Sequence, residues 1–510
     1  MVMVSSSDPS MRRLAVTKVH SVVCNRVKDD VEQYLVRWDT DEKTLSSPFS
    51  WHPIDELQRC LEHVQDYLEE RESLRKSSSQ NLVSSRKRKS PESGLDSERR
   101  ASPFDRHLQQ DGRTPSASRS PSVSLGLPTP YASPDIYNGV LDVDENGFIY
   151  CRPASGPDVA TTSTTNFPTA DMRRNSYKAN VVTASTLIRA AYVRKLQKVP
   201  GEPIRLFNTF DDSTPSLRFR YIPHYVLAKG VYQYDLDTAT GCQRCSPSMG
   251  RDIGCEYTRT CDCLEYAAVD ESRLNDKQRE TYERCKAKGL STMGLPKKFP
   301  YFTEVTKIHR AGALVPFYLH SRRPIYECND NCRCGPNCRS KNVQFGRKVE
   351  VEIFKTASGR GRGWGLRCTQ DLHPGQFIDT YRGEVITDEE ATRRENMSSK
   401  AKASYLYSLD KFEDDMQHEA YVVDGEFMGG PTKFINHSCE PNCRQYTVSY
   451  NKNDPHIYDI AFFACRDIPA YEELTFDYLD KEEGEEMDDP GEDAIPCLCG
   501  AARCRKWLWT

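Results

Sequence analysis

Apolar and polar residues alternate with the two-residue period of β-strands near the start of the chain, over residues 14–19 and 32–38. Residues 50–53 then lead into residues 55–70, where apolar positions recur at helical spacing. This order predicts a small β-sheet closed by a helix. A second amphipathic helix is expected over residues 183–196, at the entry to a C-terminal region dense in motifs.

Between these two regions the composition shifts to Ser, Pro and Arg, with little apolar periodicity. Such a segment cannot offset the entropy lost on ordering, so we expect a disordered linker over residues 71–175. Residues 71–119 hold 12 basic and 6 acidic side chains, including the cluster Arg86-Lys87-Arg88-Lys89. The cluster suggests nuclear import or contact with nucleic-acid phosphates, although a solvated run of charge is a nearly equal alternative.

Length, charge and cysteine content limit the number of domains, the binding partners and the cellular compartment that the chain allows. A chain of 510 residues allows about three globular domains. Its net charge of -4 points to local patches, not the whole chain, as the source of any attraction for nucleic acid. We find no run of about 18 apolar residues and expect a soluble intracellular protein without a membrane partner. In a reducing compartment, the 20 cysteines are interpreted first as metal ligands.

Nine cysteines fall into two groups about 65 residues apart. They are Cys242, Cys245, Cys255, Cys261 and Cys263, followed by Cys328, Cys332, Cys334 and Cys338. Three tetrahedral Zn²⁺ ions need about twelve ligand positions, which nine thiolates supply if three of them bridge. A three-zinc, nine-cysteine cluster is therefore predicted. Two separate four-cysteine sites with one bystander remain the alternative.

A further set of cysteines closes the chain: Cys497, Cys499 and Cys504. These three thiolates are one short of a tetrahedral zinc site. Cys439, about 60 residues upstream, is the candidate for the fourth ligand. A single zinc ion at this site would draw the C-terminal tail against the loop that carries Cys439.

Four motifs lie between the cysteine groups: Gly363-Trp364-Gly365, Tyr381-Arg382-Gly383-Glu384, Asn436-His437-Ser438-Cys439 and Glu473-Leu474-Thr475-Phe476-Asp477-Tyr478. With the flanking cysteines, residues 180–510 resemble a SET-domain lysine methyltransferase of the suppressor-of-variegation class. The resemblance implies a mainly β fold with a knot-like crossing, a zinc-cluster pre-SET module and a zinc-binding post-SET module. A dinucleotide-binding loop at residues 359–363 is rejected because a strand, not a helix, is expected to follow.

The resemblance also implies roles for individual residues. The S-adenosylmethionine pocket would be lined by Arg362, Gly363, Trp364, Tyr405, Asn436 and His437, and the catalytic lysine channel by Tyr381, Phe476 and Tyr478. Two departures from the family pattern stand out. Lys433 replaces the usual Arg before Phe-x-Asn-His and loses the bidentate fork. The spacing of Cys242 and Cys245 is also one residue wider than usual.

The chemistry of methyl transfer gives an independent argument for placing Phe476 and Tyr478 in the lysine channel. Methyl transfer needs a neutral amine, yet a lysine of pKa ~10.4 is only about 0.1% neutral near pH 7.4. Burial in an aromatic channel beside a sulfonium disfavours the ammonium. The hydroxyl of Tyr478 could orient the amine, whereas Phe476 offers no hydrogen bond and leaves room for repeated transfer, up to trimethylation. Simple packing at a strand end is the alternative.

The N-terminal pattern resembles a chromo domain, through residues 34–38, 50–53 and 63–68. Such domains hold methyl-lysine in a cage of three aromatic rings. Only Trp38 is in place here, because Leu14 and Asp41 stand where the other rings would align. A degenerate packing module is therefore favoured over a methyl-lysine reader.

These inferences divide the chain into seven parts. They are a chromo-like domain (11–70), the linker (71–175), an N-terminal SET-flanking region (176–241), the pre-SET module (242–345), the SET domain (346–480), an acidic loop (481–496) and the post-SET module (497–510). The stretch 480–493 carries nine acids and one lysine. It could attract a basic tail, could occupy the substrate groove, or could be a solvated linker.

The resemblance therefore implies methylation of histone H3 lysine 9 on chromatin in the nucleus, as a step in heterochromatin formation. Expected partners are the histone H3 tail or nucleosome and heterochromatin assembly factors. A methyltransferase for another histone or non-histone lysine is one alternative. A catalytically weak or inactive chromatin adaptor is the other, and Lys433 argues mildly for it.

Overall fold

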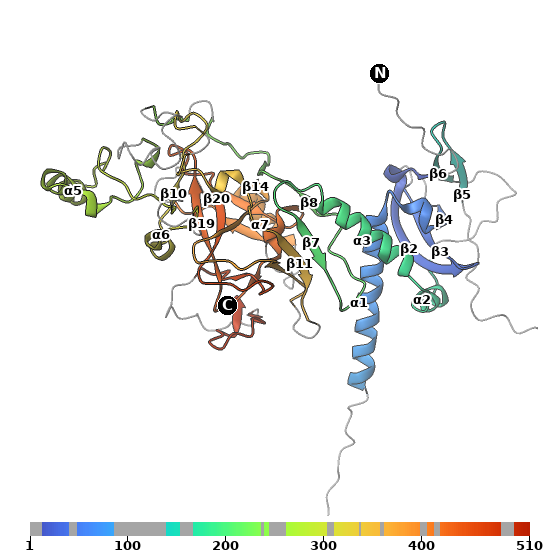
Figure 1. Ribbon diagram of the computed structural model, residues 1–510. Helices are drawn as coiled ribbons and strands as arrows, with labels where there is room; N and C mark the ends of the chain where they lie inside the picture. Colours follow the sequence, from blue (N-terminus) through green and yellow to red (C-terminus); the bar gives the residue numbers. More distant parts are fainter. Residues whose placement is uncertain are drawn as a thin grey trace, which may run out of the picture. The chain divides into compact units, whose positions relative to one another are not determined.

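The computed structural model describes residues 13–39, 48–85, 139–153, 167–235, 239–243, 262–302, 311–335, 338–357, 362–397, 405–412, 419–480 and 494–509. The chain divides into two compact units, residues 1–184 and 185–510 (Figure 1). Each unit is described separately below.

The N-terminal unit contains an antiparallel meander of β2 (Val19–Lys28), β3 (Val31–Trp38) and β4 (Phe49–Pro53). The 3-10 helix η2 (Ile54–Leu57) and helix α1 (Leu61–Ser85) follow. The predicted small sheet closed by a helix is confirmed. Trp38 is fully buried, and its Nε1 donates to Ser50 Oγ at 2.7 Å. Its ring therefore serves the core of this unit, and the chromo-like resemblance stays a prediction.

Two expectations for this unit are wrong. Residues 14–19 are not one strand: β1 (Arg13–Leu14) is separated from β2 by the 3-10 helix η1 (Val16–Lys18). Several parts of residues 71–175 are also ordered. Helix α1 runs to Ser85, and β5 (Gly139–Val143), β6 (Phe148–Pro153) and helix α2 (Ala170–Ser176) follow.

Ordering in the expected linker has a tertiary cause. Strand β6 pairs in parallel with β1 and antiparallel with β5, so its backbone groups are satisfied by a segment far away in sequence. Met172 of α2 is 1% exposed and joins the core beside Cys24 and Leu35. Local composition did not reveal these contacts. The basic cluster at residues 86–89 lies outside the described residues.

The C-terminal unit is mainly β, as predicted. Its strands are β7 (Ile204–Phe207), β8 (Arg220–Tyr221), β9 (Val226–Leu227), β10 (Ile325–Tyr326), β11 (Val351–Lys355), β12 (Trp364–Cys368), β13 (Phe377–Tyr381), β14 (Glu384–Ile386), β15 (Leu406–Ser408), β16 (Val422–Asp424), β17 (Met428–Gly429), β18 (Asn436–His437), β19 (Cys443–Ser449), β20 (Asp459–Ala464), β21 (Thr475–Phe476), β22 (Ile495–Pro496) and β23 (Trp507–Trp509). They form small sheets with the orders β12-β11-β7, β10-β19-β20-β13 and β15-β16-β14-β9, and three two-stranded pairs.

The helices that the structure describes after residue 196 in this unit are short. They are α5 (Asp276–Lys288), α6 (Pro316–Ser321) and α7 (Asp388–Met397), with the 3-10 helices η5 (Asp262–Leu264), η6 (Glu271–Arg273), η8 (Val343–Phe345) and η10 (Pro431–Phe434). Helix α3 (Val182–Leu196), predicted over 183–196, is confirmed. Helix α5 begins with a capping box, in which Asn275 and Gln278 exchange hydrogen bonds.

The core of the C-terminal unit lies around β20, where all six residues are buried. Two rings of this strand, Phe462 and Phe463, are fully buried and point to opposite faces because side chains alternate along a strand. Phe463 packs on Phe377 and Tyr446, whereas Phe462 packs on Phe476. The second contact places this core directly behind the predicted catalytic rings.

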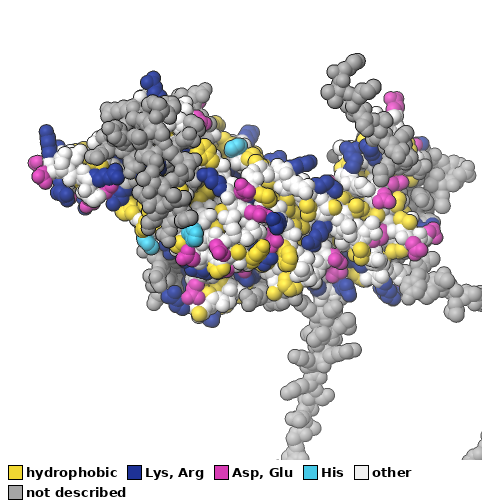
Figure 2. All heavy atoms as spheres, viewed as in Figure 1, with side chains coloured by type: hydrophobic (Ala, Val, Ile, Leu, Met, Phe, Trp, Pro, Cys, Tyr) yellow, Lys and Arg dark blue, Asp and Glu magenta, His cyan; other side chains and the backbone are white. Residues whose placement is uncertain are grey.

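The described surface mixes charges of both signs. Figure 2 shows basic and acidic side chains interspersed over the visible face, without an extended field of one sign. Among the helices that the structure describes, none has the length and apolar content needed to cross a membrane.

One buried ion pair joins Arg382, the residue after β13, to Asp459, the first residue of β20. The Arg382 guanidinium pairs with both carboxylate oxygens of Asp459, and the two side chains are 13% and 9% exposed. Removing one partner of a buried pair leaves an uncompensated charge, so Arg382→Met should lower the free energy of unfolding by about 3–5 kcal/mol. Chemical unfolding measures this change.

The matched control is the exposed pair Arg466–Glu472, whose side chains are 51% and 34% exposed. Arg466→Met should cost less than about 1 kcal/mol because water screens an exposed pair. Equal losses in the two variants would contradict the role assigned to Arg382.

Candidate functional site: a strand crossing flanked by two thiol groups

The site is built on a crossing of two segments about 40 residues apart. Strands β18 and β21 run in parallel, with Asn436 opposite Thr475 and His437 opposite Phe476. The N–H of Ser438 donates to Phe476 O at 3.0 Å and extends the pairing by one bond. The crossing therefore joins the motif predicted for the cofactor to the motif predicted for the lysine channel.

On one side of the crossing, polar groups converge on Glu473. Asn436 Nδ2 donates to Glu473 Oε1 at 2.8 Å and to the carbonyl oxygen of Trp364 at 3.0 Å. Arg362 Nη2 lies 2.7 Å from Glu473 Oε2. Asn436 and Arg362 thus meet at one carboxylate, and Asn436 also binds the backbone of Trp364, so three of the six residues predicted for the cofactor pocket lie together here.

The same corner fits an anionic or polar ligand. Arg362 Nε is buried and has no hydrogen-bond partner within the described part of the chain. An unpaired buried donor is costly, and a ligand carboxylate would satisfy it. Gly363 has φ +69°, a conformation that L side chains rarely adopt, so the backbone can turn sharply beside this donor. The residues present are therefore suited to the carboxylate of S-adenosylmethionine.

His437 connects the crossing with the C-terminal thiols. Its Nδ1 accepts from the Tyr478 N–H at 3.1 Å, and its Nε2 lies 3.4 Å from Cys439 Sγ. Burial lowers the pKa of His437 to about 4, although Asp477 opposes the shift. The imidazole is therefore neutral near pH 7. We assign its proton to Nε2 because Nδ1 is the acceptor.

On the other side of the crossing, aromatic rings line up. The Phe476 and Tyr478 rings have centroids 4.7 Å apart, and Phe462 packs edge-on against Phe476 at 4.8 Å. Tyr478 donates its hydroxyl proton to Ile435 O at 2.9 Å. Burial, followed by the nearby Tyr405 phenol, raises the pKa of Tyr478. This phenol is therefore protonated near neutral pH, and lone pairs of its oxygen remain as acceptors.

Tyr381 approaches the same region from β13. Its hydroxyl donates to Tyr405 O at 2.7 Å, and its ring lies 6.1 Å from Tyr407. Burial, followed by the Tyr478 phenol, raises the pKa of Tyr381. A Cβ on Gly425 would lie 2.4 Å from the Tyr381 hydroxyl, so only glycine leaves space for it. The structure thus brings all three predicted channel rings to one region.

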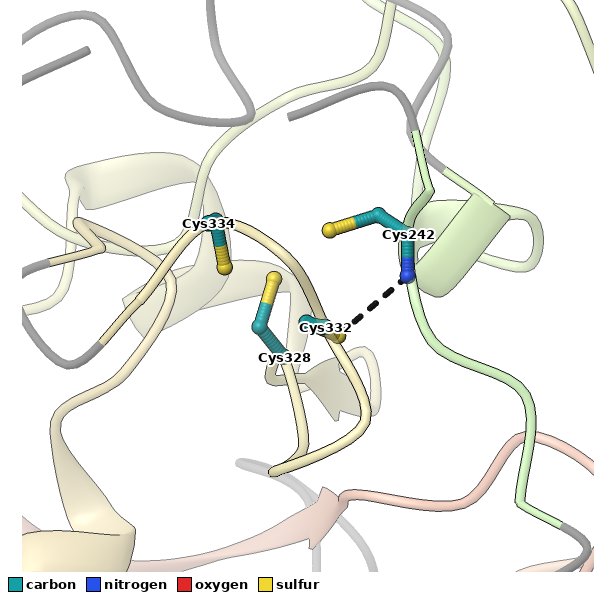
Figure 3. A group of neighbouring side chains, drawn as sticks. All are labelled: Cys242, Cys328, Cys332 and Cys334. Carbon is teal, nitrogen blue, oxygen red and sulfur yellow. Dashed lines mark hydrogen bonds between the residues drawn. The ribbon is translucent and has the colours of Figure 1, made fainter. Parts of the chain in front are cut away.

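The pre-SET thiols gather as predicted, as far as they are described. The sulfurs of Cys242, Cys328, Cys332 and Cys334 all lie within 4.8 Å of one another (Figure 3). Cys263 Sγ is 3.0 Å from Cys332 Sγ, and Cys338 Sγ is 3.8 Å from Cys328 Sγ. Six of the nine predicted ligands therefore lie together. The other three, Cys245, Cys255 and Cys261, lie outside the described residues.

The second thiol group is confirmed in full. The sulfurs of Cys439, Cys497, Cys499 and Cys504 lie within 4.8 Å of one another. Four thiols at this spacing suit tetrahedral Zn²⁺, and the fourth thiol of the group is that of the upstream cysteine that the sequence suggested. The tail is held here by protein contacts too. Arg505 makes two hydrogen bonds to the Asp477 carboxylate, one of them at 2.8 Å.

Two important side chains received no role from the sequence. Glu473, described above, was quoted only as part of a motif. Asn442 is 1% exposed; it accepts from the Thr475 N–H and donates to Glu473 O, both at 2.8 Å. It therefore fixes the segment that enters β21. Its position three residues after Cys439 was the one feature of the sequence that could have drawn attention to it. Its hydrogen-bond partners are more than 30 residues away along the chain.

Comparisons with known proteins agree with this geometry. A SET domain model matches residues 363–479, and a Pre-SET motif model matches residues 196–341. The chain is 39% identical over 319 residues to the H3 lysine-9 specific histone-lysine N-methyltransferase dim-5 of Neurospora crassa. The matched region covers 60% of this chain and 88% of the relative. The chain is also 39% identical over 317 residues to the H3 lysine-9 specific histone-lysine N-methyltransferase KMT1 of Fusarium mangiferae, with the same two shares.

Among solved structures, the chain is similar to the Neurospora SET domain protein DIM-5, described as a histone lysine methyltransferase. The identity is 36%, the TM-score is 0.44, and the match covers 56% of this chain and 98% of that chain. The sequence comparisons and the two domain matches confirm the predicted resemblance. The chain belongs to the SET-domain histone-lysine N-methyltransferases of the suppressor-of-variegation class.

Proposed function

We propose that this chain transfers methyl groups from S-adenosylmethionine to lysine 9 of histone H3, up to trimethylation, on chromatin in the nucleus. The observation that carries the proposal is the parallel pairing of β18 with β21. It sets the Asn436–Glu473 corner and the Phe476–Tyr478 rings on neighbouring strands. The choice of lysine 9 rests on the relatives, because no described contact selects one lysine over another.

The chain's own contribution begins with deprotonation of the substrate amine. S-adenosylmethionine, when bound, supplies an electrophilic methyl group on a cationic sulfonium. Neutralising a lysine amine near pH 7.4 costs about 4 kcal/mol in water. Burial between Phe476, Tyr478 and Tyr381 would reduce that cost by disfavouring the ammonium, so no dedicated base is needed.

Tyr478 is suited to orient the amine. Its own proton is committed to Ile435 O, so the oxygen meets an amine as an acceptor. An amine N–H donated to this oxygen leaves the nitrogen lone pair directed elsewhere, toward the methyl donor. Orientation of this kind accounts for a large part of the barrier reduction in displacement reactions.

Zinc has a structural role in this proposal. We infer three Zn²⁺ ions in the pre-SET cluster and one in the post-SET site, held by the thirteen cysteines predicted above. The post-SET ion would fix Cys439, two residues after His437, and so support one side of the crossing. The heterochromatin assembly factors and the nucleic-acid contact remain predictions.

Two alternatives are weighed against this function. A methyltransferase for another histone or non-histone lysine would use the same site. An inactive adaptor is disfavoured because Asn436, Tyr478 and the thiol groups are all in place.

The orienting role of Tyr478 predicts a specific kinetic loss. Tyr478→Phe removes the acceptor but keeps the ring, so kcat should fall by about 10²–10³-fold while binding of S-adenosylhomocysteine changes little. Transfer to an H3 tail peptide, followed by mass spectrometry, measures the first quantity, and calorimetry measures the second. Unchanged kcat would remove the assignment.

Phe476 predicts the extent of methylation. Phe476→Tyr adds a hydroxyl that can hold a water or the amine, which hinders rotation of a methylated amine, so the product should stop at one or two methyl groups. The control is Phe427→Tyr, at a ring that is 59% exposed, and it should still yield the trimethylated peptide. Trimethylation by both variants would argue against Phe476 as the determinant.

Zinc content tests the two metal sites. Elemental analysis should find about four zinc ions per wild-type chain and about three in Cys499→Ser, with loss of methyl transfer in that variant. Cys285→Ala is the control, because this buried cysteine of α5 belongs to neither thiol group. It should retain about four ions. Fewer than four in the wild type would favour separate mononuclear pre-SET sites.

A further inference from the structure

The ammonium group of Lys433 is surrounded by aromatic rings. Its Nζ lies 4.0 Å from the ring centroid of Phe219, 4.6 Å from that of Tyr405 and 5.7 Å from that of Phe434. It also donates to Glu426 O at 2.8 Å. A lysine ammonium within about 6 Å of a ring centroid is attracted by the ring quadrupole. Lys433 thus binds three aromatic side chains from three separate segments.

One of these rings is linked to the predicted site by its backbone. The carbonyl oxygen of Tyr405 accepts from the Tyr381 hydroxyl at 2.7 Å and from the Gly425 N–H at 3.1 Å. Tyr405 is therefore held at two places, its carbonyl by the channel residue Tyr381 and its ring by Lys433. Loss of the ammonium would release the ring but leave the backbone contacts.

The environment of Lys433 makes its charge sensitive to pH. Burial lowers the pKa of Lys433 to about 8, while the carboxylates of Glu426 and Asp424 oppose the shift. Asp424 is itself paired with Arg394 at 2.6 Å. Among the charged groups near Phe219 is Lys195, whose Nζ donates to Phe219 O at 3.1 Å.

We propose that Lys433 is a positioning residue, whose protonated side chain fixes the Tyr405 ring against the S-adenosylmethionine pocket by cation–π contact. This inference rests on the proposed role of Tyr405 in cofactor binding. The arginine that the family resemblance implies at this position would keep its charge at any working pH. The lysine makes cofactor affinity depend on pH, and affinity falls as the ammonium loses its proton.

Binding of S-adenosylhomocysteine to the full chain tests the proposal. This product lacks the sulfonium charge, and its binding does not involve the substrate amine. Affinity should be measured by calorimetry from pH 7 to pH 9.5 in the wild type and in Lys433→Arg. The ligand's own amino group titrates equally in both proteins, so their difference isolates Lys433. We expect the wild type to lose roughly tenfold more affinity than Lys433→Arg over this range.

Lys297 provides the matched control. It is 3% exposed, its pKa is lowered by burial to about 8, and it donates to Glu265 O, Ala267 O and Thr292 Oγ1. The pH-dependent loss should persist in Lys297→Arg. Lys433→Met should bind weakly at every pH, close to the wild type at pH 9.5. If that variant does not fold, the comparison with Lys433→Arg still decides.

The outcomes separate this inference from the proposed function. Identical pH dependence in the wild type and Lys433→Arg would overturn the positioning role. Loss of the pH dependence in Lys297→Arg would do so too, since it would assign the titration to a different lysine. Absence of methyl transfer to histone H3, with the expected binding differences present, would instead count only against the proposed substrate.

Discussion

The site depends on a two-residue parallel pairing that cannot be stable alone. Strands β18 and β21 are each only two residues long, and they come from segments about 40 residues apart. Closing such a loop costs entropy before any contact is gained. A short ladder repays little of that cost. The surrounding structure must therefore supply most of the free energy that keeps the crossing in register.

Three kinds of interaction supply it. The side chain of the buried Asn442 makes hydrogen bonds to the backbone N–H of Thr475 and to the backbone carbonyl of Glu473, where the chain enters β21. The Phe462 ring packs on Phe476 from the buried strand β20. Arg505 and the second thiol group draw the C-terminal tail to Asp477 and Cys439. Hydrogen bonds, apolar packing and a group of thiols suited to zinc thus act on the same few residues from different directions.

The sequence identified the residues suited to bind metal, cofactor and substrate, but it did not identify the side chains that hold those residues in place. The cysteine groups and the motif around Asn436 were recognisable because the residues within each group lie close together along the chain. Glu473 and Asn442 were not, because their value lies in partners that are 30 or more residues away. Lys433 was noted only as the loss of an arginine fork, whereas the structure places it among three rings.

In the fold, too, local features were predicted from the sequence and features that depend on distant partners were not. The sheet closed by α1 and the helix α3 were predicted from periodicity, which is a local property, whereas the mainly β class was implied by the family resemblance. Strands β5 and β6 were missed, because β6 pairs with the distant strand β1 and β5 pairs with β6, which their own composition does not reveal.

A crystal structure of the full chain with S-adenosylhomocysteine and a histone H3 tail peptide tests the arrangement of the site most directly. We expect lysine 9 to enter between Phe476 and Tyr478, with its amine facing the cofactor sulfur and within hydrogen-bond reach of the Tyr478 hydroxyl. A cofactor bound away from the Asn436–Glu473 corner, or an amine beyond reach of Tyr478, would contradict this arrangement.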